Sequence, residues 1–180
     1  MGRVVSRFRY WLFGPKLCRV LMLGLPNSGK STILRRLKNG DIDNDIEEPT
    51  GFNVETVKYR DVAFTIWDMG GDHKVRNIWK HYYSSVKLTI FVVDSSDIKG
   101  LREAMQELSD LLQVPDLKGI SLLILANKQD LIGSLNADEI AQELKLRNIK
   151  DREWRLQLTS GLYGEGLKRT LEWMYARIKG

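Results

Sequence analysis

The stretch GLPNSGKS, residues 24 to 31, constrains the fold of this chain more than any other. It has Walker A spacing, and it lies between an apolar run at 18–24 and a helical pattern at 30–40. Glycines in such a loop let backbone amides approach phosphate oxygens, the lysine supplies a cation, and the helix N-terminus adds partial positive charge. A hydroxyl at the last position can ligate Mg²⁺. The sequence therefore predicts a phosphate-binding turn between the first strand and the first helix.

Pro26 is unusual inside this turn, because proline has no N–H to donate and holds φ near −65°. Either Pro26 removes a contact to the terminal phosphate, or this position donates nothing and proline simply suits the loop. The second interpretation is the simpler one. The residues expected to contact nucleotide here are Gly24, Leu25, Pro26, Asn27, Ser28, Gly29, Lys30, Ser31 and Thr32, with Ser31 also a candidate Mg²⁺ ligand.

Strand-like and helix-like patterns alternate along the rest of the chain, which predicts an α/β fold with a six-stranded, mostly parallel sheet. The runs at 88–94 and 121–127 are continuously apolar, as in strands covered on both faces. The segments 52–59 and 62–68 predict a hairpin and one antiparallel edge strand. Helices are expected at 2–13, 30–40, 99–113, 137–146 and 164–179, and further strands at 18–24 and 154–159.

The charge distribution argues against nucleic acid as a partner. The net charge is +5, but nine of the 28 Lys and Arg lie in residues 1–40, which contain no Asp or Glu. The other 19 basic residues are outnumbered by 23 acidic ones, a net of −4. The single cysteine, Cys18, excludes an internal disulfide and favours a reducing compartment. No apolar run approaches the length of a transmembrane helix.

The motif Asn127-Lys128-Gln129-Asp130 ends an apolar strand about 100 residues after the Walker A loop. The Asp130 carboxylate can accept hydrogen bonds from N1–H and the 2-amino group of guanine, donors that adenine lacks. The Lys128 stem can cover the base, and Asn127 can connect this pocket to the phosphate loop. A solvated turn is the alternative for so short a motif, but together the two motifs indicate GTP or GDP as the ligand.

The chain resembles a small Ras-type GTPase of the Arf and Arf-like (ADP-ribosylation factor) family, essentially from end to end. The resemblance rests on Met1-Gly2, GFNVETV at 51–57, WDMGG at 67–71, NKQD, and the ending GEGL…LEWM. It implies an amphipathic N-terminal helix at 1–16 and a Ras-like G domain at 17–180 that binds GTP or GDP with Mg²⁺. It also implies a monomeric switch in membrane traffic, cytoplasmic and reversibly associated with Golgi or other endomembranes, with an exchange factor, a GTPase-activating protein and effectors as partners.

The resemblance further implies roles around the terminal phosphate. Thr50 would ligate Mg²⁺ in the GTP state, Asp68 would hold a Mg²⁺-bound water, and the Gly71 amide would contact the γ phosphate. Thr50 adjoins Gly51 directly, whereas the family has an aliphatic residue between them. Either the loop bulges and Thr50 still reaches the metal, or this ligand is misplaced, since Mg²⁺ tolerates little departure from octahedral geometry.

Two further sites follow from the same resemblance. The backbone of Ser160 and Gly161 would contact guanine O6, although these residues depart from the family's usual turn. An aromatic surface for effectors would be formed by Phe52, Trp67 and Tyr82, with ordinary core packing as the alternative.

Asp72 replaces the glutamine that orients the attacking water in the family, and it joins Lys30 and Gly71 as a candidate catalytic residue. A carboxylate only accepts hydrogen bonds, is repelled by the γ phosphate, and reaches less far. Hydrolysis is therefore expected to be slow. Alternatively, Asp72 turns outward to Lys74 or Arg76, or His73 acts on the water. A nucleotide-binding scaffold with little hydrolysis is the second hypothesis; a P-loop kinase is disfavoured by the guanine motif.

The N-terminal end carries the signals for a membrane. Gly2 and Ser6 fit the N-myristoylation pattern, and one acyl chain needs a second signal for stable attachment. An apolar stripe and the basic residues of 1–19 can supply that signal. The alternative is a helix that only packs on the domain. The resemblance implies that the helix packs on the domain with GDP bound and is released to the membrane with GTP bound. In the GTP state, the 52–68 hairpin would slide in two-residue steps and displace the helix.

Overall fold

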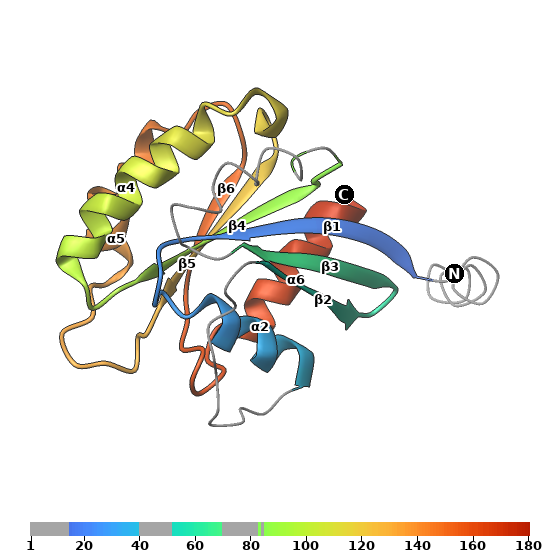
Figure 1. The fold of residues 1–180 in the computed structure, drawn as a ribbon, viewed down its shortest axis with the longest axis horizontal. Helices are drawn as coiled ribbons and strands as arrows, with labels where there is room; N and C mark the ends of the chain where they lie inside the picture. Colours follow the sequence, from blue (N-terminus) through green and yellow to red (C-terminus); the bar gives the residue numbers. More distant parts are fainter. Residues whose placement is uncertain (1–14, 40–51, 70–82, 84) are drawn as a thin grey trace.

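The computed structural model describes residues 15–39, 52–69, 83 and 85–180 (Figure 1). Their strands form a six-stranded sheet in the order β2-β3-β1-β4-β5-β6. β2 is an edge strand antiparallel to β3, and the other pairings are parallel, which confirms the predicted sheet. The strands are β1 (Lys16–Leu23), β2 (Phe52–Tyr59), β3 (Val62–Met69), β4 (Leu88–Asp94), β5 (Ser121–Asn127) and β6 (Trp154–Leu158).

Helices cover both faces of this sheet, with α4 and α5 on one face and α2 and α6 on the other (Figure 1). A sheet covered in this way buries both sets of alternating side chains, which explains the uninterrupted apolar runs of β4 and β5. The helices are α2 (Lys30–Asn39), α4 (Ile98–Leu112), α5 (Ala137–Glu143) and α6 (Leu167–Lys179), with the short 3₁₀ helices η2 (Pro115–Leu117) and η3 (Leu146–Asn148).

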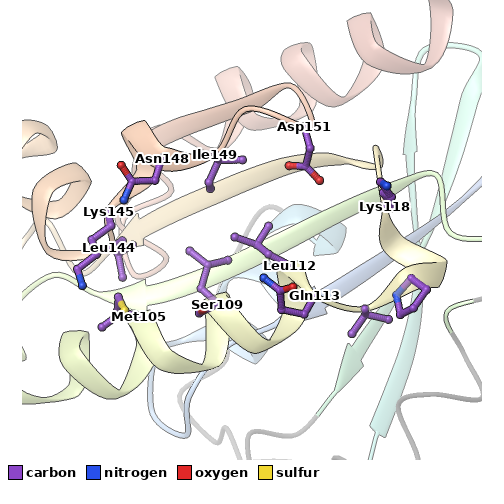
Figure 2. Close-up of a pocket in the computed structure, with 13 residues that line it drawn as sticks. Met105, Ser109, Leu112, Gln113, Lys118, Leu144, Lys145, Asn148, Ile149 and Asp151 are labelled. Carbon is purple, nitrogen blue, oxygen red and sulfur yellow. The ribbon is translucent and has the colours of Figure 1, made fainter.

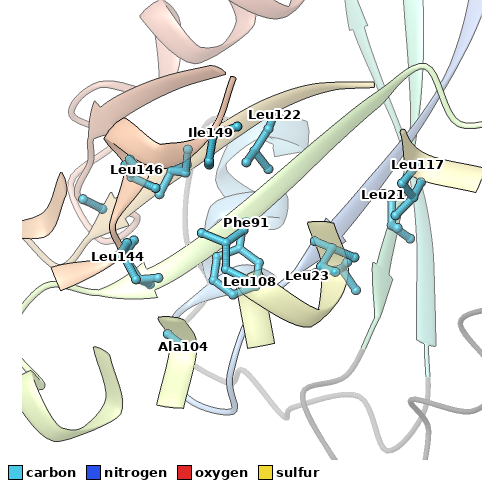
Figure 3. Packing of buried hydrophobic residues seen from close by; sticks show 14 of the residues in the cluster. Leu21, Leu23, Phe91, Ala104, Leu108, Leu117, Leu122, Leu144, Leu146 and Ile149 are labelled. Carbon is cyan, nitrogen blue, oxygen red and sulfur yellow. The ribbon is translucent and has the colours of Figure 1, made fainter. Parts of the chain in front are cut away.

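The central strand β1 shows how the sequence divides the core. Cys18, Val20 and Met22 join the apolar cluster under α2 and α6. Leu21 and Leu23 point the other way and join the cluster under α4 and α5, part of which Figure 3 shows. Because successive strand side chains point to opposite faces, one eight-residue strand contributes to both halves of the core.

Two helix boundaries differ from the expected ones for reasons of backbone conformation. The helix expected at 137–146 ends early, because Lys145 adopts a left-handed φ of 52° between α5 and η3. The helix expected at 164–179 begins only at Leu167. Gly166 precedes it with φ 77°, and a Cβ there would lie 2.1 Å from the carbonyl oxygen of Leu158. The helix expected at 2–13 lies outside the described residues.

The tip of the β2–β3 hairpin is bonded to the end of α6. Lys179 Nζ donates to Asp61 Oδ2 at 2.5 Å, and the Tyr175 hydroxyl donates to Asp61 Oδ1 at 2.8 Å. The hydrogen bond from Lys179 is the main cause that holds the pKa of Asp61 below its ordinary value. The guanidinium of Arg60 lies 5.1 Å from the ring centre of Tyr59 and 4.9 Å from that of Tyr175, distances at which cation–π attraction operates.

The start of β1 takes part in the same junction. The backbone N–H of Lys16 donates to the carbonyl of Asp61 at 2.9 Å, and Lys16 Nζ donates to the carbonyl of Ile178 at 2.8 Å. Hairpin tip, first strand and last helix therefore meet at one corner of the domain. Along the described ranges, no helix combines the length and apolar character needed to cross a bilayer.

Candidate nucleotide-binding site

The phosphate loop links the end of β1 to the start of α2, as the sequence predicts. Lys30 is buried, and its Nζ donates to the carbonyls of Gly24 at 3.1 Å and Leu25 at 2.8 Å, so the ammonium group is held across the loop. Pro26 lies exposed in the turn. The first turn of α2 contains no acidic residue, which leaves the positive end of the helix dipole available to an anion.

Asn127, at the end of β5, connects the loops of the site through one buried side chain. Its Nδ2 donates to the Ser28 carbonyl in the phosphate loop at 2.9 Å. Its Oδ1 accepts from the Gly161 N–H at 2.8 Å, in the turn after β6. A Cβ on Gly29 would lie 2.3 Å from Asn127 Nδ2, so only glycine at this position lets the Asn127 side chain pass so close to the phosphate loop. The contact expected between Asn127 and the phosphate loop is therefore present.

Asp130 is fixed by a contact that sequence reasoning missed. The Ser160 hydroxyl donates to Asp130 Oδ1 at 2.5 Å and accepts from the Tyr163 N–H at 3.1 Å. The sequence interpretation gave Ser160 only a backbone role. The sequence signal for this contact was the serine itself. Its hydroxyl can donate to a nearby carboxylate, which the methyl group of alanine cannot do.

Lys128 is fixed by a second contact that was missed. Its Nζ pairs with Asp94 Oδ2 at 2.7 Å, and Asp94 Oδ1 accepts from the N–H and hydroxyl of Ser96 at 2.9 and 2.6 Å. Burial acts to raise the pKa of Asp94, but the hydrogen bonds from Lys128 and Ser96 outweigh it and lower that pKa. The register pairs Asp94 with Asn127 at the ends of β4 and β5. Asp94 thus positions the lysine stem expected to cover the base.

Replacing Asp94 with alanine should speed nucleotide release about fivefold, because freeing the Lys128 side chain removes an ordered contact worth about 1 kcal/mol. Release of a fluorescent GDP analogue into excess GDP measures this rate. Asp110→Ala, on the outer surface of α4, is the control. An unchanged release rate in Asp94→Ala, together with a lowered melting temperature, would assign Asp94 a purely structural role.

Ser31 and Asp68, which the sequence predicts near a metal, lie in hydrogen-bond contact with each other. The Ser31 hydroxyl donates to Asp68 Oδ2 at 2.7 Å, and Asp68 is fully buried. Hydroxyl and carboxylate oxygens are the donors that Mg²⁺ accepts, and this ion usually completes its shell with phosphate and water. The described residues contain no cluster of three or more His, Cys, Asp or Glu able to hold a metal.

The remaining candidate residues are described only in part. Trp67 is half-buried, packs against the α4–α5 cluster, and has the Arg19 guanidinium 5.4 Å from its ring centre, which agrees with the core-packing interpretation. Phe52 begins β2 opposite Met69, but its side chain is not described. The residues that lie outside the described ranges are Gly2, Thr50, Gly71, Asp72 and Tyr82.

A phosphate loop after β1 and an Asn-Lys-x-Asp turn after β5, both at the carboxyl ends of parallel strands, define a P-loop protein with a guanine-nucleotide pocket. The ADP-ribosylation factor family model matches residues 5–178, so the chain belongs to the Arf family. It is also similar to the small GTPase Arl6 (BBS3) of Trypanosoma brucei, solved with the nucleotide analogue GppNp. That match has 36% identity and a TM-score of 0.80, and covers 89% of this chain and 96% of the other.

The family and the fold together define the class of activity. The chain is a small GTP-binding switch protein, of a class that hydrolyses GTP and works with exchange factors, GTPase-activating proteins and effectors. The Ras-like G domain expected from the sequence is confirmed.

Proposed function

We propose that this protein is a membrane-recruited switch that binds GTP or GDP with Mg²⁺, hydrolyses GTP slowly, and regulates membrane traffic through GTP-dependent effectors. The observation that carries the nucleotide part is the Asn127 junction, where one side chain joins the phosphate loop, the NKQD turn and the turn after β6. Through these hydrogen bonds, the residues expected to bind the base and those expected to bind the phosphates are held in one connected network.

Within this proposal, the chain's own residues bind and orient the nucleotide. Lys30 and the backbone of the phosphate loop neutralise the β and γ phosphates, while Asp130 accepts hydrogen bonds from the guanine edge. Ser31, with Thr50 in the GTP state, would ligate Mg²⁺, and Asp68 would hold a water of its shell. The bound ion supplies charge neutralisation at the phosphates.

Nucleotide content after purification tests the binding part of the proposal. The protein should retain about one guanine nucleotide per chain in Mg²⁺ and lose it faster in a chelator. Chromatography of the acid-released nucleotide identifies the base and the number of phosphates. Recovery of an empty protein that binds neither GTP nor GDP would overturn the proposal. Retention of unhydrolysed GTP over many hours would instead favour the scaffold without turnover.

Replacing Asp72 with glutamine should speed intrinsic hydrolysis by about tenfold or more, equal to about 1.4 kcal/mol of barrier. Glutamine can both accept from the attacking water and donate to a phosphate oxygen, reaches one methylene further, and carries no charge. Single-turnover hydrolysis of preloaded GTP measures the rate. Asp72→Asn separates the loss of charge from the gain in reach. If the glutamine variant is no faster than the parent, Asp72 is not the cause of slow hydrolysis.

The membrane part of the proposal depends on the N-terminal end. Myristate at Gly2 and the basic residues of 1–19 would act together, since a single acyl chain binds reversibly and weakly. Co-sedimentation with anionic phospholipid vesicles should require both the acyl chain and a GTP analogue. Gly2→Ala provides the unacylated control. Equal recovery of the GDP-loaded or unacylated protein on vesicles would refute GTP-dependent recruitment. The organelle expected from the resemblance is the Golgi or another endomembrane.

A further inference from the structure

A groove lies between the C-terminal half of α4 and the segment that connects α5 to β6 (Figure 2). Its volume is about 610 Å³, within the range of clefts that hold ligands. Met105 and Leu112 on α4 are half-buried and, with Ile149 on the opposite wall, give the groove an apolar lining. None of its lining residues belongs to the candidate nucleotide site.

Both walls of the groove are held in place by the core behind them. Leu146 is fully buried and packs in the same cluster as Leu108 of α4, as Figure 3 shows. At the other end, the Arg152 side chain is 3% exposed, and its guanidinium donates to the carbonyls of Leu117 at 2.9 Å and Leu112 at 3.2 Å. This arginine ties the end of α4 to the start of β6. The groove is therefore preorganised, which lowers the entropy lost on binding.

The rim of the groove is positively charged. Lys145 and Lys118 lie at its opposite ends, and both are exposed (Figure 2). Among the described residues that line it, the one carboxylate is Asp151. Arg152 binds this carboxylate through two nitrogens, at 2.7 and 3.1 Å, and these hydrogen bonds lower the pKa of Asp151. Because its charge is compensated in place, the two lysines dominate the electrostatics of the rim.

The size of the groove fits a short helix. From Met105 to Leu112, α4 advances about 10 Å at 1.5 Å per residue, the length of about two helical turns. A helix laid beside α4 would present apolar side chains three and four residues apart toward such a lining. Acidic residues at its two ends would reach Lys118 and Lys145.

We propose that this groove docks an acidic amphipathic helix of a partner protein. The partner's apolar side chains cover Met105, Leu112 and Ile149, and its carboxylates pair with the two rim lysines. The groove lies near the amino end of β6, whereas the phosphate loop and NKQD turn lie at the carboxyl ends of the parallel strands. Docking is therefore independent of the bound nucleotide, and its failure would leave the proposed switch function intact.

The test uses a fluorescent stapled peptide with leucines at helical positions i, i+3, i+4 and i+7 and glutamates at both ends. The matched peptide carries lysines in place of the glutamates. Anisotropy titrations should show binding of the glutamate peptide to the full-length protein, with equal affinity for its GDP form and its GTP-analogue form. NMR signals of the Met105, Leu112 and Ile149 methyl groups should shift.

The double variant Lys118→Glu, Lys145→Glu should bind the glutamate peptide at least about tenfold more weakly and the lysine peptide at least about tenfold more tightly. The control, Lys168→Glu with Arg169→Glu on the exposed side of α6, should bind like the parent. Equal binding of both peptides to the parent, or shifts confined to methyl groups elsewhere, would overturn the proposal. So would oleate shifting the groove methyls while the glutamate peptide leaves them unchanged, since the occupant would then be a fatty anion.

Discussion

Asp130→Asn should weaken GDP and GTP binding by about a thousandfold and create binding of xanthine nucleotides. A carboxylate accepts from both N1–H and the 2-amino group of guanine, and hydrogen bonds to a charged group contribute about 1.5–3 kcal/mol each. An asparagine side chain offers one acceptor and one donor. Its N–H₂ group opposes the guanine amine but suits the 2-oxo group of xanthine. Displacement of a fluorescent GDP analogue by GDP, XDP and ADP measures all three affinities.

Ser160→Ala is the control for this experiment. It keeps the carboxylate but removes the hydroxyl that donates to Asp130 Oδ1 at 2.5 Å. Because one orienting hydrogen bond contributes about 1 kcal/mol, this variant should lose about fivefold in affinity without changing base preference. An Asp130→Asn protein that still binds GDP within threefold of the parent would place the base somewhere other than beside the NKQD turn.

Arg152→Ala should lower the free energy of unfolding by about 3 kcal/mol. The substitution removes a buried arginine side chain, takes the donor from the Leu112 carbonyl, and leaves the Leu117 carbonyl with only the Ile120 N–H at 3.2 Å. Removing one partner from a buried charged contact costs about 3–5 kcal/mol, and the half-exposed Asp151 places this case at the lower end. The urea midpoint should fall by about 1–2 M.

Two variants separate the causes of that loss. Arg155→Ala removes an exposed arginine from β6 and should change stability by less than about 0.5 kcal/mol. Arg152→Lys keeps the charge but lacks the planar fork of donors, so it should recover only part of the loss. If Arg152→Ala unfolds at the same urea concentration as the parent, this guanidinium does not hold α4 to β6.

The sequence was a good guide to elements whose pattern is local. The runs at 88–94 and 121–127 have the bounds of β4 and β5, because a strand covered on both faces must be apolar throughout. The phosphate loop could be predicted equally well, since its glycines and lysine are needed at fixed spacing within one turn. The Asn127 contact followed from placing two local motifs at the same edge of a parallel sheet.

The contacts that the sequence did not indicate join residues far apart in the chain. Arg152 bonds carbonyls 35 and 40 residues away, and these partners depend on how α4 ends beside β6. The pairing of Asp94 with Lys128 depends on the register between β4 and β5. From the sequence alone, the side chains of these charged residues cannot be told from those of solvated loop residues. The left-handed conformation of Lys145 likewise has no usual sequence signal, since glycine or asparagine is typical there.

The junction between Lys16 and Ile178 has a practical consequence for attaching reporters to this protein. The start of β1 and the end of α6 lie at the same corner of the domain (Figure 1). If the anchor proposed upstream of residue 16 binds the bilayer, a fluorescent protein fused after Gly180 would compete with the bilayer for space. The exposed loop at Gly133 is no alternative, because Gly133 has φ 86° and the neighbouring Ser134 hydroxyl donates to the Lys128 carbonyl at 2.7 Å, beside the expected base pocket. This loop follows β5 and so lies at the carboxyl ends of the parallel strands, whereas the corner lies at the amino end of β1.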